Sequence, residues 1–499
     1  MKKFFLSILF TFLFSQIENE KLYITIQMMD QVGVVNTQSN QITSIIETEL
    51  SNMNDSNACM EASDEMTCNM ISGCHWMIDM CMESSNSCED ITDEMACDMA
   101  NGCDWMMGMC MESMGSNETN TPHFIVMDEI LGYWFVTTIA SGYIAQYSLI
   151  DNVLIDKYFV GDAPAILAID TENQKIYCSR MMPMNGMGDM MPSSQSQIIH
   201  SLAYSPMGLT ESGINEFEIS SPAPHGITIN HDGSEIYTAS NTTDWLYKIY
   251  TDTGNIQGVP MDSNIGNPAG QITQRLKPIQ CLSIDNKLFV SCSAGTWYNP
   301  FTGENIIVPG QLQMWNSDTM ELIDLIEFGD YTGPWHIKES PVDNVVYVAL
   351  SGDNLYNTEG LAAVSFTSNN LELDWITENQ LFDTLHGVDV SSDGQFIYVS
   401  GRGDGYIHKF NASGEYIDNL YTGGMSMLGG ICITKKSLPV LGDNNNDNII
   451  DVIDIIVITN YILDNLMLAP YQLYSSNINN DDVINIVDIV DIVNIILED

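Results

Sequence analysis

Basic residues are scarce in this 499-residue sequence, with 15 Lys and Arg against 66 Asp and Glu and a formal net charge of −51. Nucleic acids and anionic membranes are recognised through clustered basic side chains, so this balance argues against both as main partners. After the N-terminus no stretch reaches 18 apolar residues without a charge, so we predict no transmembrane segment. Because 45% of the residues are hydrophobic, the acidic chain can still build a packed core.

Familiar catalytic motifs are also missing. The sequence contains no G-x-S-x-G elbow, no H-E-x-x-H helix and no phosphate-binding loop. Carboxylates are so abundant that no acid pair for glycoside hydrolysis stands out. The tripeptide Arg402-Gly403-Asp404 looks like a cell-adhesion signal, but its Gly-rich setting favours a turn. These absences favour a non-catalytic protein.

The N-terminus has the pattern of a secretory signal. Lys2 and Lys3 form a basic start, residues 4–14 form an apolar run, and Ser15 is a small residue suited to cleavage. The run is too short for a membrane span of about 20 residues. We therefore expect residues 1–15 to be a bacterial-type export signal, and the mature protein to be secreted, extracellular or at the cell surface, where disulfides persist.

Eight of the twelve cysteines form two consecutive units that repeat with a period of 29 residues. The matching pairs are Cys59 and Cys88, Cys68 and Cys97, Cys74 and Cys103, and Cys81 and Cys110. Each unit is too short to bury a core, so disulfides are the expected staple; zinc is the alternative, but no C-x-x-C pair is present. The G-C-x-W spacing resembles the small plexin-type (PSI-like) cysteine repeats. Residues 52–118 are therefore predicted to be a duplicated Cys/Met-rich disulfide module, in which the pairing stays open.

A hairpin pattern recurs between residues 122 and 436: a short apolar strand, a turn and an aromatic-rich strand. The clearest hairpins begin at Pro122, Pro164, Pro224, Pro278, Pro334 and Leu385. The turn dipeptides Asp232-Gly233, Asp285-Asn286 and Asp393-Gly394 favour tight hairpins. Repeats of about 40–60 residues with four strands each are typical of a β-propeller, and the pattern resembles the YVTN/NHL-like propellers.

The chain ends suggest how this propeller closes. Six full blades are followed by an orphan strand from Gly429, and residues 21–50 supply the outer strands that a seventh blade lacks. We therefore predict seven blades, closed by pairing residues 430–435 with residues 22–27. The cysteine module is then an insertion between the split seventh blade (21–50) and the blades of 122–436.

Histidine and methionine gather where a propeller would place them on one face. His123, His225 and His386 share one register at the start of inner strands, and His336 is one residue out of that register. A methionine-rich loop joins the second and third strands of its blade, with Met181, Met182, Met184, Met187, Met190 and Met191. Imidazole and thioether ligands suit copper, because soft ligands select Cu(I). The alternatives are structural histidines and a flexible Met-rich binding surface.

Two loops near the C-terminus place oxygen-bearing side chains at positions 1, 3, 5, 9 and 12, with a backbone carbonyl at position 7. The first loop has Asp443, Asn445, Asp447, Asp451 and Asp454 with the carbonyl of Ile449, and the second has Asn477, Asn479, Asp481, Asn485 and Asp488 with the carbonyl of Val483. Calcium takes six to eight oxygens, and this spacing wraps them around one ion. We predict two calcium sites, the second weaker because its position 1 is Asn.

Each loop runs into an apolar segment of helical character, at 455–463 and 489–497. A loop and helix duplicated at an offset of 34 residues, with Asp at position 12, resembles a type I dockerin over residues 441–499. The resemblance implies a cohesin-like or other extracellular protein partner. The chain departs from the family at position 6 (Asn448 and Asp482 in place of Gly) and at the partner-contacting positions 10 and 11 (Val452-Ile453 and Ile486-Val487 in place of polar pairs). An apolar or intramolecular contact is the alternative to a cohesin.

The predicted fold is thus an all-β, seven-bladed β-propeller with a disulfide-rich insertion and a small all-α dockerin-like C-terminal module. The leading functional hypothesis is a secreted, non-catalytic recognition or scaffold protein. In this hypothesis the propeller face binds a ligand or partner, and the C-terminal module gives calcium-dependent docking or anchoring. The alternatives are a copper-binding protein or copper-dependent oxidoreductase, and a lyase or hydrolase that processes extracellular polysaccharide.

Overall fold

The computed structural model describes two compact units of the chain, 1–47 with 121–499, and 48–120. Side chains are described for residues 20–48, 120–161, 163–181, 197–262, 266–353, 355–423, 426–434, 438–481 and 483–497, and backbone alone for 74–77, 80–83, 103–106, 109–112 and 498. The predicted signal peptide lies outside the described residues. Among the described helices, none has the length and apolar character needed to cross a membrane.

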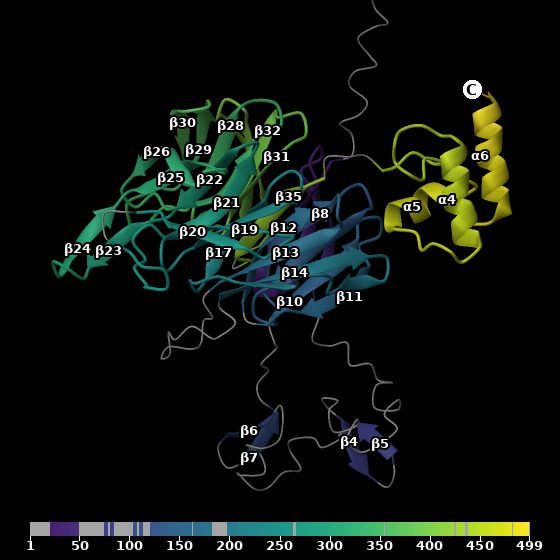
Figure 1. The fold of residues 1–499 in the computed structure, drawn as a ribbon, viewed down its shortest axis with the longest axis horizontal. Coiled ribbons are helices and arrows are strands. Elements are labelled where there is room, and N and C mark those ends of the chain that lie inside the picture. The colour runs from purple at the N-terminus through teal and green to yellow at the C-terminus, as the bar shows by residue number, and fades with distance from the viewer. Residues whose placement is uncertain are drawn as a thin grey trace, which may run out of the picture. The chain divides into compact units, whose positions relative to one another are not determined.

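The first unit contains seven antiparallel sheets arranged as the blades of a β-propeller (Figure 1). The blades are numbered below in the order of this list, with the split blade of β35 and β1 as the first. From the innermost strand outward, the blades are β35 (Leu428–Ile433), β1 (Lys21–Ile26), β2 (Gln31–Asn36) and β3 (Gln41–Glu47); β8 (Pro122–Asp128), β9 (Tyr133–Thr138), β10 (Tyr143–Ser148) and β11 (Leu154–Phe159); β12 (Pro164–Asp170), β13 (Lys175–Arg180) and β14 (Ile198–Ser205) with β15 (Gly208–Thr210) and β16 (Glu216–Glu218); β17 (Pro224–Ile229), β18 (Glu235–Ser240), β19 (Trp245–Tyr250) and β20 (Ile256–Pro260); β21 (Pro278–Ile284), β22 (Lys287–Cys292), β25 (Gly310–Asn316) and β26 (Glu321–Gly329); β27 (Pro334–Glu339), β28 (Val345–Leu350), β29 (Gly360–Phe366) and β30 (Leu371–Glu378); and β31 (Leu385–Val390), β32 (Phe396–Gly401), β33 (Tyr406–Asn411) and β34 (Tyr416–Tyr421).

The two ends of the propeller sequence meet in one sheet. Strand β1 pairs antiparallel with β35, with Leu22 opposite Ile433 and Ile24 opposite Ile431. The backbone N–H of Lys21 donates to the Thr434 hydroxyl at 2.8 Å, which extends the junction by one residue. The predicted closing pair is therefore confirmed. It joins the two ends of the propeller sequence in one blade, while the outer strand of each blade remains a short edge.

Apolar side chains pack between neighbouring blades and hold the ring together. One such cluster joins Tyr237 and Leu246 of the fourth blade to Val290 and Trp315 of the fifth. The thiols Cys281 and Cys292 are buried in the same cluster and form no disulfide. They serve as small core residues, and burial raises the pKa of both thiols.

The fifth blade carries a hairpin that the strand pattern did not predict. Strands β23 (Gly295–Asn299) and β24 (Glu304–Val308) pair with each other between β22 and β25. Trp297 at its base is buried in the core, whereas Tyr298 and Phe301 at its tip are exposed. Its alternating residues look like one more blade strand in the sequence, because periodicity alone does not say which sheet a strand joins.

Three helices follow the propeller: α4 (Val452–Ile462), α5 (Pro470–Ser476) and α6 (Ile486–Glu498). The short helix α5 contacts the second blade, where the Tyr471 backbone N–H donates to the Leu131 carbonyl at 3.1 Å. The Tyr471 ring covers Gly132, and a Cβ added there would lie 2.3 Å from the ring. Ala469, just before α5, is buried in the core cluster of this blade. The helical segment is thus anchored to the propeller through α5, whereas positions 10 and 11 of the two loops stay exposed.

The second unit contains two hairpins, β4 (Cys74–Met77) with β5 (Met80–Glu83), and β6 (Cys103–Met106) with β7 (Met109–Glu112). Their registers are identical, with Trp76 opposite Cys81 and Trp105 opposite Cys110. The repeat seen in the sequence is therefore a repeat of structure. Four predicted disulfide cysteines lie on these strands, while Cys59, Cys68, Cys88 and Cys97 lie outside the described residues. The disulfides remain a prediction.

Candidate functional site

The four inner-strand histidines lie at β-bulges. Each is the second or third residue of its strand, where the pairing with the neighbouring strand shifts register. The shifts fall between Pro122 and Ile125, Pro224 and Gly226, Pro334 and Ile337, and Leu385 and Val388. A bulge inserts an extra residue and re-aims a side chain. Strands β8 and β27 shift over the same span, so Trp335 corresponds in register to His123 and His336 to the next residue of the bulge. The His336 ring nevertheless lies 4.6 Å from the His386 ring.

The four imidazoles form a cluster around the propeller axis. The His123 ring centroid lies 5.6 Å from that of His386 and 6.4 Å from those of His225 and His336, and His336 and His386 are 4.6 Å apart. All four side chains are buried. The sequence therefore identified residues that the structure brings together from four different blades.

Several polar atoms of this cluster are buried without a hydrogen-bond partner among the described residues. They are Nε2 of His123, Nε2 of His336, Nδ1 of His386 and the indole Nε1 of the neighbouring Trp335. The Trp335 ring lies 5.3 Å from the His386 ring and 6.4 Å from the His225 ring. An unpaired buried polar group costs roughly 1–3 kcal/mol, so four in one place suggest a missing partner.

A hydrogen-bond chain leads from the cluster to a cation. The Arg402 Nη1 donates to the Gln27 side-chain oxygen at 2.5 Å, and the Gln27 amide nitrogen lies 2.8 Å from Nδ1 of His123. Gln27 is buried and follows β1 at the start of the 3₁₀ turn η1 (Gln27–Met29), whereas Arg402 follows β32. The chain therefore connects the first and last segments of the propeller ring.

Burial keeps the imidazoles neutral. Desolvation is the main cause that lowers the pKa of all four histidines, and it lowers that of His336 to about 3. The neighbouring imidazoles and the Arg402 guanidinium lower the pKa values of His123, His336 and His386 further, because like charges disfavour protonation. At neutral pH the cluster therefore offers neutral N–H groups and lone pairs beside one guanidinium.

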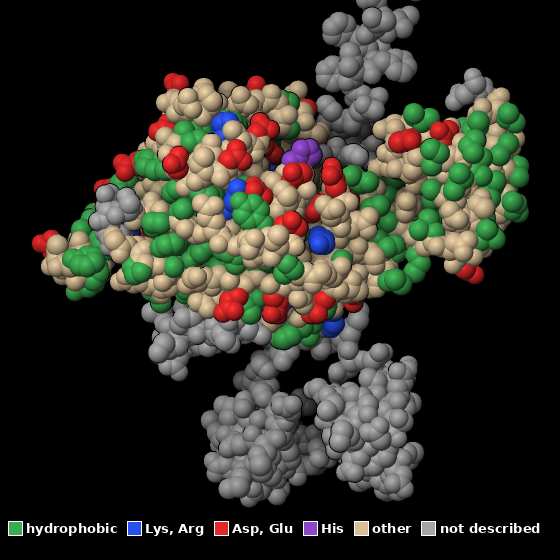
Figure 2. Space-filling view, in the orientation of Figure 1, with side chains coloured by type: hydrophobic (Ala, Val, Ile, Leu, Met, Phe, Trp, Pro, Cys, Tyr) green, Lys and Arg blue, Asp and Glu red, His purple; other side chains and the backbone are tan. Residues whose placement is uncertain are grey.

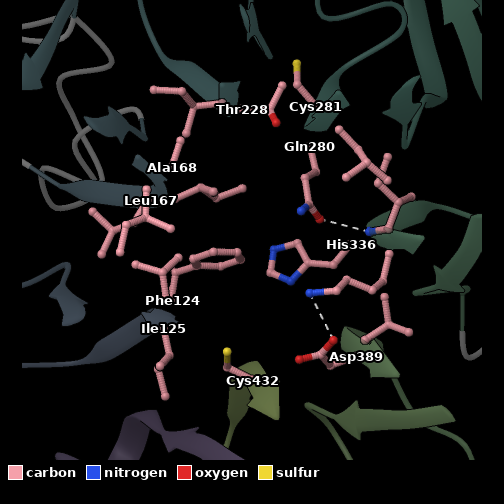
Figure 3. A pocket seen from close by; sticks show the side chains of 18 of the residues that line it. Phe124, Ile125, Leu167, Ala168, Thr228, Gln280, Cys281, His336, Asp389 and Cys432 are labelled. Carbon is pink, nitrogen blue, oxygen red and sulfur yellow. Dashed lines mark hydrogen bonds and ion pairs between the residues drawn. The ribbon is translucent and has the colours of Figure 1, made fainter. Parts of the chain in front are cut away.

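A cavity of about 390 Å³ adjoins the cluster and is lined by inner strands of the blades. His336 and Phe124 line it, and their rings lie 5.3 Å apart. Figure 3 shows the His336 imidazole projecting into this cavity, with the Lys338–Asp389 ion pair beside it. The wall is mixed in character, since both apolar residues such as Leu167 and polar residues such as Gln280 line it.

In the ion pair that lines the cavity, the Asp389 carboxylate is held in place by the backbone. The Lys338 Nζ lies 3.0 Å from the Asp389 carboxylate, whose oxygens also accept the backbone N–H groups of Val390 and Ile433. Asp389 is 1% exposed and Lys338 is 30% exposed in its side chain. Asp389 raises the pKa of Lys338 against the opposing effect of burial. The ammonium is therefore charged and faces the cavity.

The described side chains of the cluster do not form a complete set of metal ligands. Across the described residues, no three His, Cys, Asp or Glu side chains are gathered tightly enough to hold a metal ion. Met181 packs half-buried against the core cluster of the third blade. The other methionines of the predicted soft-metal set, Met182, Met184, Met187, Met190 and Met191, lie outside the described residues.

Sequence reasoning missed Gln27, Trp335 and Arg402. Arg402 was assigned only to a turn, and the structure does place a turn there, with the Gly405 N–H donating to the Gly401 carbonyl at 3.0 Å. The neighbouring Asp404 accepts from His408 at 3.0 Å and is held inside the blade. No local signal marks Gln27 or Trp335, because their importance comes from the positions of other blades.

The first predicted calcium loop has its carboxylates oriented by its own backbone. The Asp443 carboxylate accepts the N–H groups of residues 447 and 448, and the Asp454 carboxylate accepts those of 444, 445 and 451. Asp454 is fully buried, and desolvation raises its pKa. Asn448 at position 6 has φ +67°. Asn tolerates this left-handed conformation, so the departure from Gly does not disturb the loop.

The second loop repeats these bonds. The Asn477 side chain accepts the Asp481 N–H, and the Asp488 carboxylate accepts the N–H groups of Ile478 and Asn485. Asp482 lies outside the described residues. Both helices begin three residues before the predicted apolar segments, because position 12 lies inside the first turn. In α4, Asp451 and Asp454 form a capping box. The oxygen-rich side chains of both loops fit calcium. The assignment of individual ligands stays a prediction from the sequence pattern.

Helices α4 and α6 leave an apolar surface exposed. Positions 10 and 11 of each loop are uncovered, with Val452 62%, Ile453 50%, Ile486 64% and Val487 47% exposed. Figure 2 shows hydrophobic side chains spread over this helical segment. The departure from polar pairs therefore produces an exposed apolar patch at corresponding positions of both repeats, which we call the paired apolar patch.

No family model and no curated protein matches this chain. Solved structures match it in fold. A functionally unknown protein from Desulfotomaculum acetoxidans is 12% identical with a TM-score of 0.52, covering 84% of this chain and 100% of its own. A protein from Lactobacillus plantarum is 12% identical with a TM-score of 0.51, covering 83% and 99%. A putative 6-phosphogluconolactonase from Bacteroides uniformis is 11% identical with a TM-score of 0.48, covering 66% and 92%. At these identities the first two matches show likeness of fold alone and nothing about activity.

Proposed function

We propose that this protein is a secreted, non-catalytic recognition or scaffold protein. Its propeller binds a ligand near the axis, and its dockerin-like C-terminal module docks to an extracellular, cohesin-like or other protein partner in a calcium-dependent way. The paired apolar patch carries this proposal. Exposed apolar side chains at matching positions of two repeats are typical of a protein interaction surface.

The geometry of the module supports docking in trans. Tyr471 and Ala469 contact the propeller from α5 and its start, so the intramolecular contact uses neither repeat's positions 10 and 11. Each half of the paired apolar patch lies in the first turn of a helix, and in α4 this turn is held by a loop carboxylate, that of Asp454. Calcium binding would hold these turns rigid and thereby preorganise the patch, which lowers the entropy cost of docking.

A pull-down from the secreted fraction of the native host tests this function. The full chain is expected to retain partners in calcium and lose them in EDTA. Replacing Ile453 and Val487 with Asp should also abolish retention, because each charge would be desolvated in the interface. The matched control is Ile307→Asp on the exposed hairpin of the fifth blade, which should retain partners. Equal recovery with calcium and with EDTA would rule out calcium-dependent docking.

Copper binding at the histidine cluster is the second candidate, and the unpaired imidazole nitrogens favour it. The His225 Nδ1 lies 2.7 Å from the Ile279 carbonyl, so it donates and leaves Nε2 with a lone pair. A ligating histidine usually donates its other ring N–H in this way. His336 and His386 would complete a three-imidazole set, with the Met-rich loop as a source of thioethers. Elemental analysis after copper loading tests it, and less than one copper per chain rejects it.

The third candidate, a lyase or hydrolase that acts on extracellular polysaccharide, rests only on the dockerin resemblance. It predicts release of reducing ends from plant or microbial polysaccharides by the purified chain. A lack of product with a broad polysaccharide panel would leave recognition as the role of the propeller.

A further inference from the structure

The hydrogen-bond chain at the cluster has a direction that the chemistry of its members determines. A guanidinium only donates, so the Gln27 atom that faces Arg402 must be the oxygen. The Gln27 amide nitrogen then donates to Nδ1 of His123. A neutral imidazole that accepts at Nδ1 carries its proton at Nε2. The buried, unpaired Nε2 of His123 is therefore an N–H donor.

A second unpaired donor lies in the same cluster. The Trp335 indole Nε1 is buried without a partner among the described residues, and an indole N–H can only donate. Trp335 precedes His336 in the bulge of β27, which aims both side chains toward the cluster. Two groups that can only donate need an acceptor between or beside them.

The charge of Arg402 points to the sign of that acceptor. Among the described residues Lys248, Arg275 and Lys338 each have a carboxylate partner, at Glu235, Asp262 and Asp389. Arg402 has none, although the chain carries 66 acidic residues. It is partly buried beside the histidines, where burial makes an unpaired charge costly.

We propose that the histidine cluster is a binding site for a small monovalent anion, such as a carboxylate group or a halide, held by the Nε2–H of His123, the indole N–H of Trp335 and the charge of Arg402. This deepens the proposed function, because it names the chemistry of the ligand that the propeller binds near its axis. It is independent of calcium docking, which uses the C-terminal module.

The same geometry disfavours His123 as a metal ligand. A metal needs the lone pair of a ring nitrogen, and the other ring nitrogen should then donate to an acceptor. Here the Gln27 amide donor occupies Nδ1, so the proton sits on the nitrogen that would face the metal. Copper binding by the other three histidines is therefore the competing outcome of the test.

The matched variant is Gln27→Glu, which has nearly the same shape. A carboxylate at this position accepts from both Arg402 and Nδ1–H of His123, so the His123 proton moves to Nδ1. This variant should lose anion binding and gain affinity for Cu(II). Arg402→Gln removes the charge and shortens the side chain that donates to Gln27, and Arg275→Gln removes a distant arginine as the control.

Bromide and acetate are the probes. Crystals of the full chain soaked in sodium bromide should show an anomalous peak among His123, Trp335 and Arg402, and acetate should compete with it. In solution, each anion should raise the melting temperature of the wild type and of Arg275→Gln. Loss of one charge-assisted hydrogen bond should weaken apparent anion affinity roughly tenfold or more in Arg402→Gln and Gln27→Glu.

A measurement on the unaltered protein guards against variants that fail to fold. In ¹⁵N-histidine-labelled wild type at neutral pH, His123 should be the Nε2–H tautomer, seen in long-range ¹H–¹⁵N correlations. An Nδ1–H tautomer, or a crystal with water alone at the cluster after soaking, overturns the proposal. Stoichiometric copper bound by the wild type with no bromide peak overturns it in favour of the metal site.

Discussion

The histidine cluster and the C-terminal loops are both candidate binding sites rich in buried polar groups, but they are built in opposite ways. In the first loop, donors and acceptors lie within twelve residues, and Asp443 and Asp454 are paired by their own backbone. In the cluster, Gln27 and His123 are 96 residues apart, and Gln27 and Arg402 are 375 apart. The loop satisfies its polar atoms internally, whereas the cluster leaves several unpaired.

A site with local pairing satisfies its own polar groups, while a site assembled from many blades can leave polar atoms available for a ligand. The closed propeller makes the second kind possible, because packing between blades stabilises each inner strand regardless of what the axis contains. The comparison leads to three further expectations.

The largest expected effect is an opposite response of the two sites to pH. The cluster histidines have folded pKa values below the ordinary 6.5. Their stabilising contribution is thus complete above pH 6.5 and is lost as the pH falls toward the folded values. Each histidine contributes a slope of up to about 1.4 kcal/mol per pH unit. Urea unfolding followed by tryptophan fluorescence should show this loss between pH 7 and 5.

In the tail the sign reverses. The pKa of Asp454 is raised above 3.8, so its contribution without calcium is present below 3.8 and is lost as the pH rises through the folded value. Protection factors from hydrogen exchange of residues 441–498 in EDTA, corrected for the intrinsic pH dependence of exchange, should therefore rise on acidification. His386→Leu should flatten the slope of the propeller, and the exposed His231→Gln should not. Parallel responses of the two regions would contradict this contrast.

The second-largest effect is a difference in stability between variants that remove a paired polar group and variants that remove an unpaired one. Asn444 is buried and accepts from the Ser475 and Ser476 hydroxyls at 2.8 and 2.9 Å. Asn444→Ala should reduce tail stability by about 2–4 kcal/mol, because both hydroxyls lose their acceptor. His386→Leu removes an unpaired nitrogen and should change propeller stability at pH 7.5 by less than about 1 kcal/mol.

Hydrogen exchange measures the loss of tail stability in Asn444→Ala, and urea unfolding measures the change in propeller stability in His386→Leu. A large loss for His386→Leu in low-salt buffer would show that the cluster is already satisfied internally.

The smallest effect concerns the two loops themselves. Asn477 takes the place that Asp443 has in the first loop, so the second site has one negative charge less. Asn477→Asp should strengthen calcium binding at the second site and Asp443→Asn should weaken it at the first, each by roughly tenfold. Competition with a calcium-sensitive dye measures both. His386→Leu serves as the control, and a change in its calcium affinity would mean that the two regions are coupled.

Prediction from the sequence succeeded where the pattern was repetitive. The seven blades and the closing pair of β1 with β35 followed from period and turn chemistry. It failed for the β23–β24 hairpin, whose residues alternate like those of any blade strand. Arg402 was taken for part of a turn, because the turn is local and its contact with Gln27 is not. His336 lies one residue further along its bulge than His123 does in β8, and only the structure shows that its ring still joins the others.

Local patterns in the sequence are enough to predict the propeller, the duplication of the cysteine units and the loop–helix repeats, since each depends on interactions between residues close in the chain. That four histidines, a tryptophan and an arginine share one buried space, and in which direction their hydrogen bonds run, follows from the folded ring. The cause is closure: the ring brings residue 27 against residue 402, and no local pattern records which side chains then face each other.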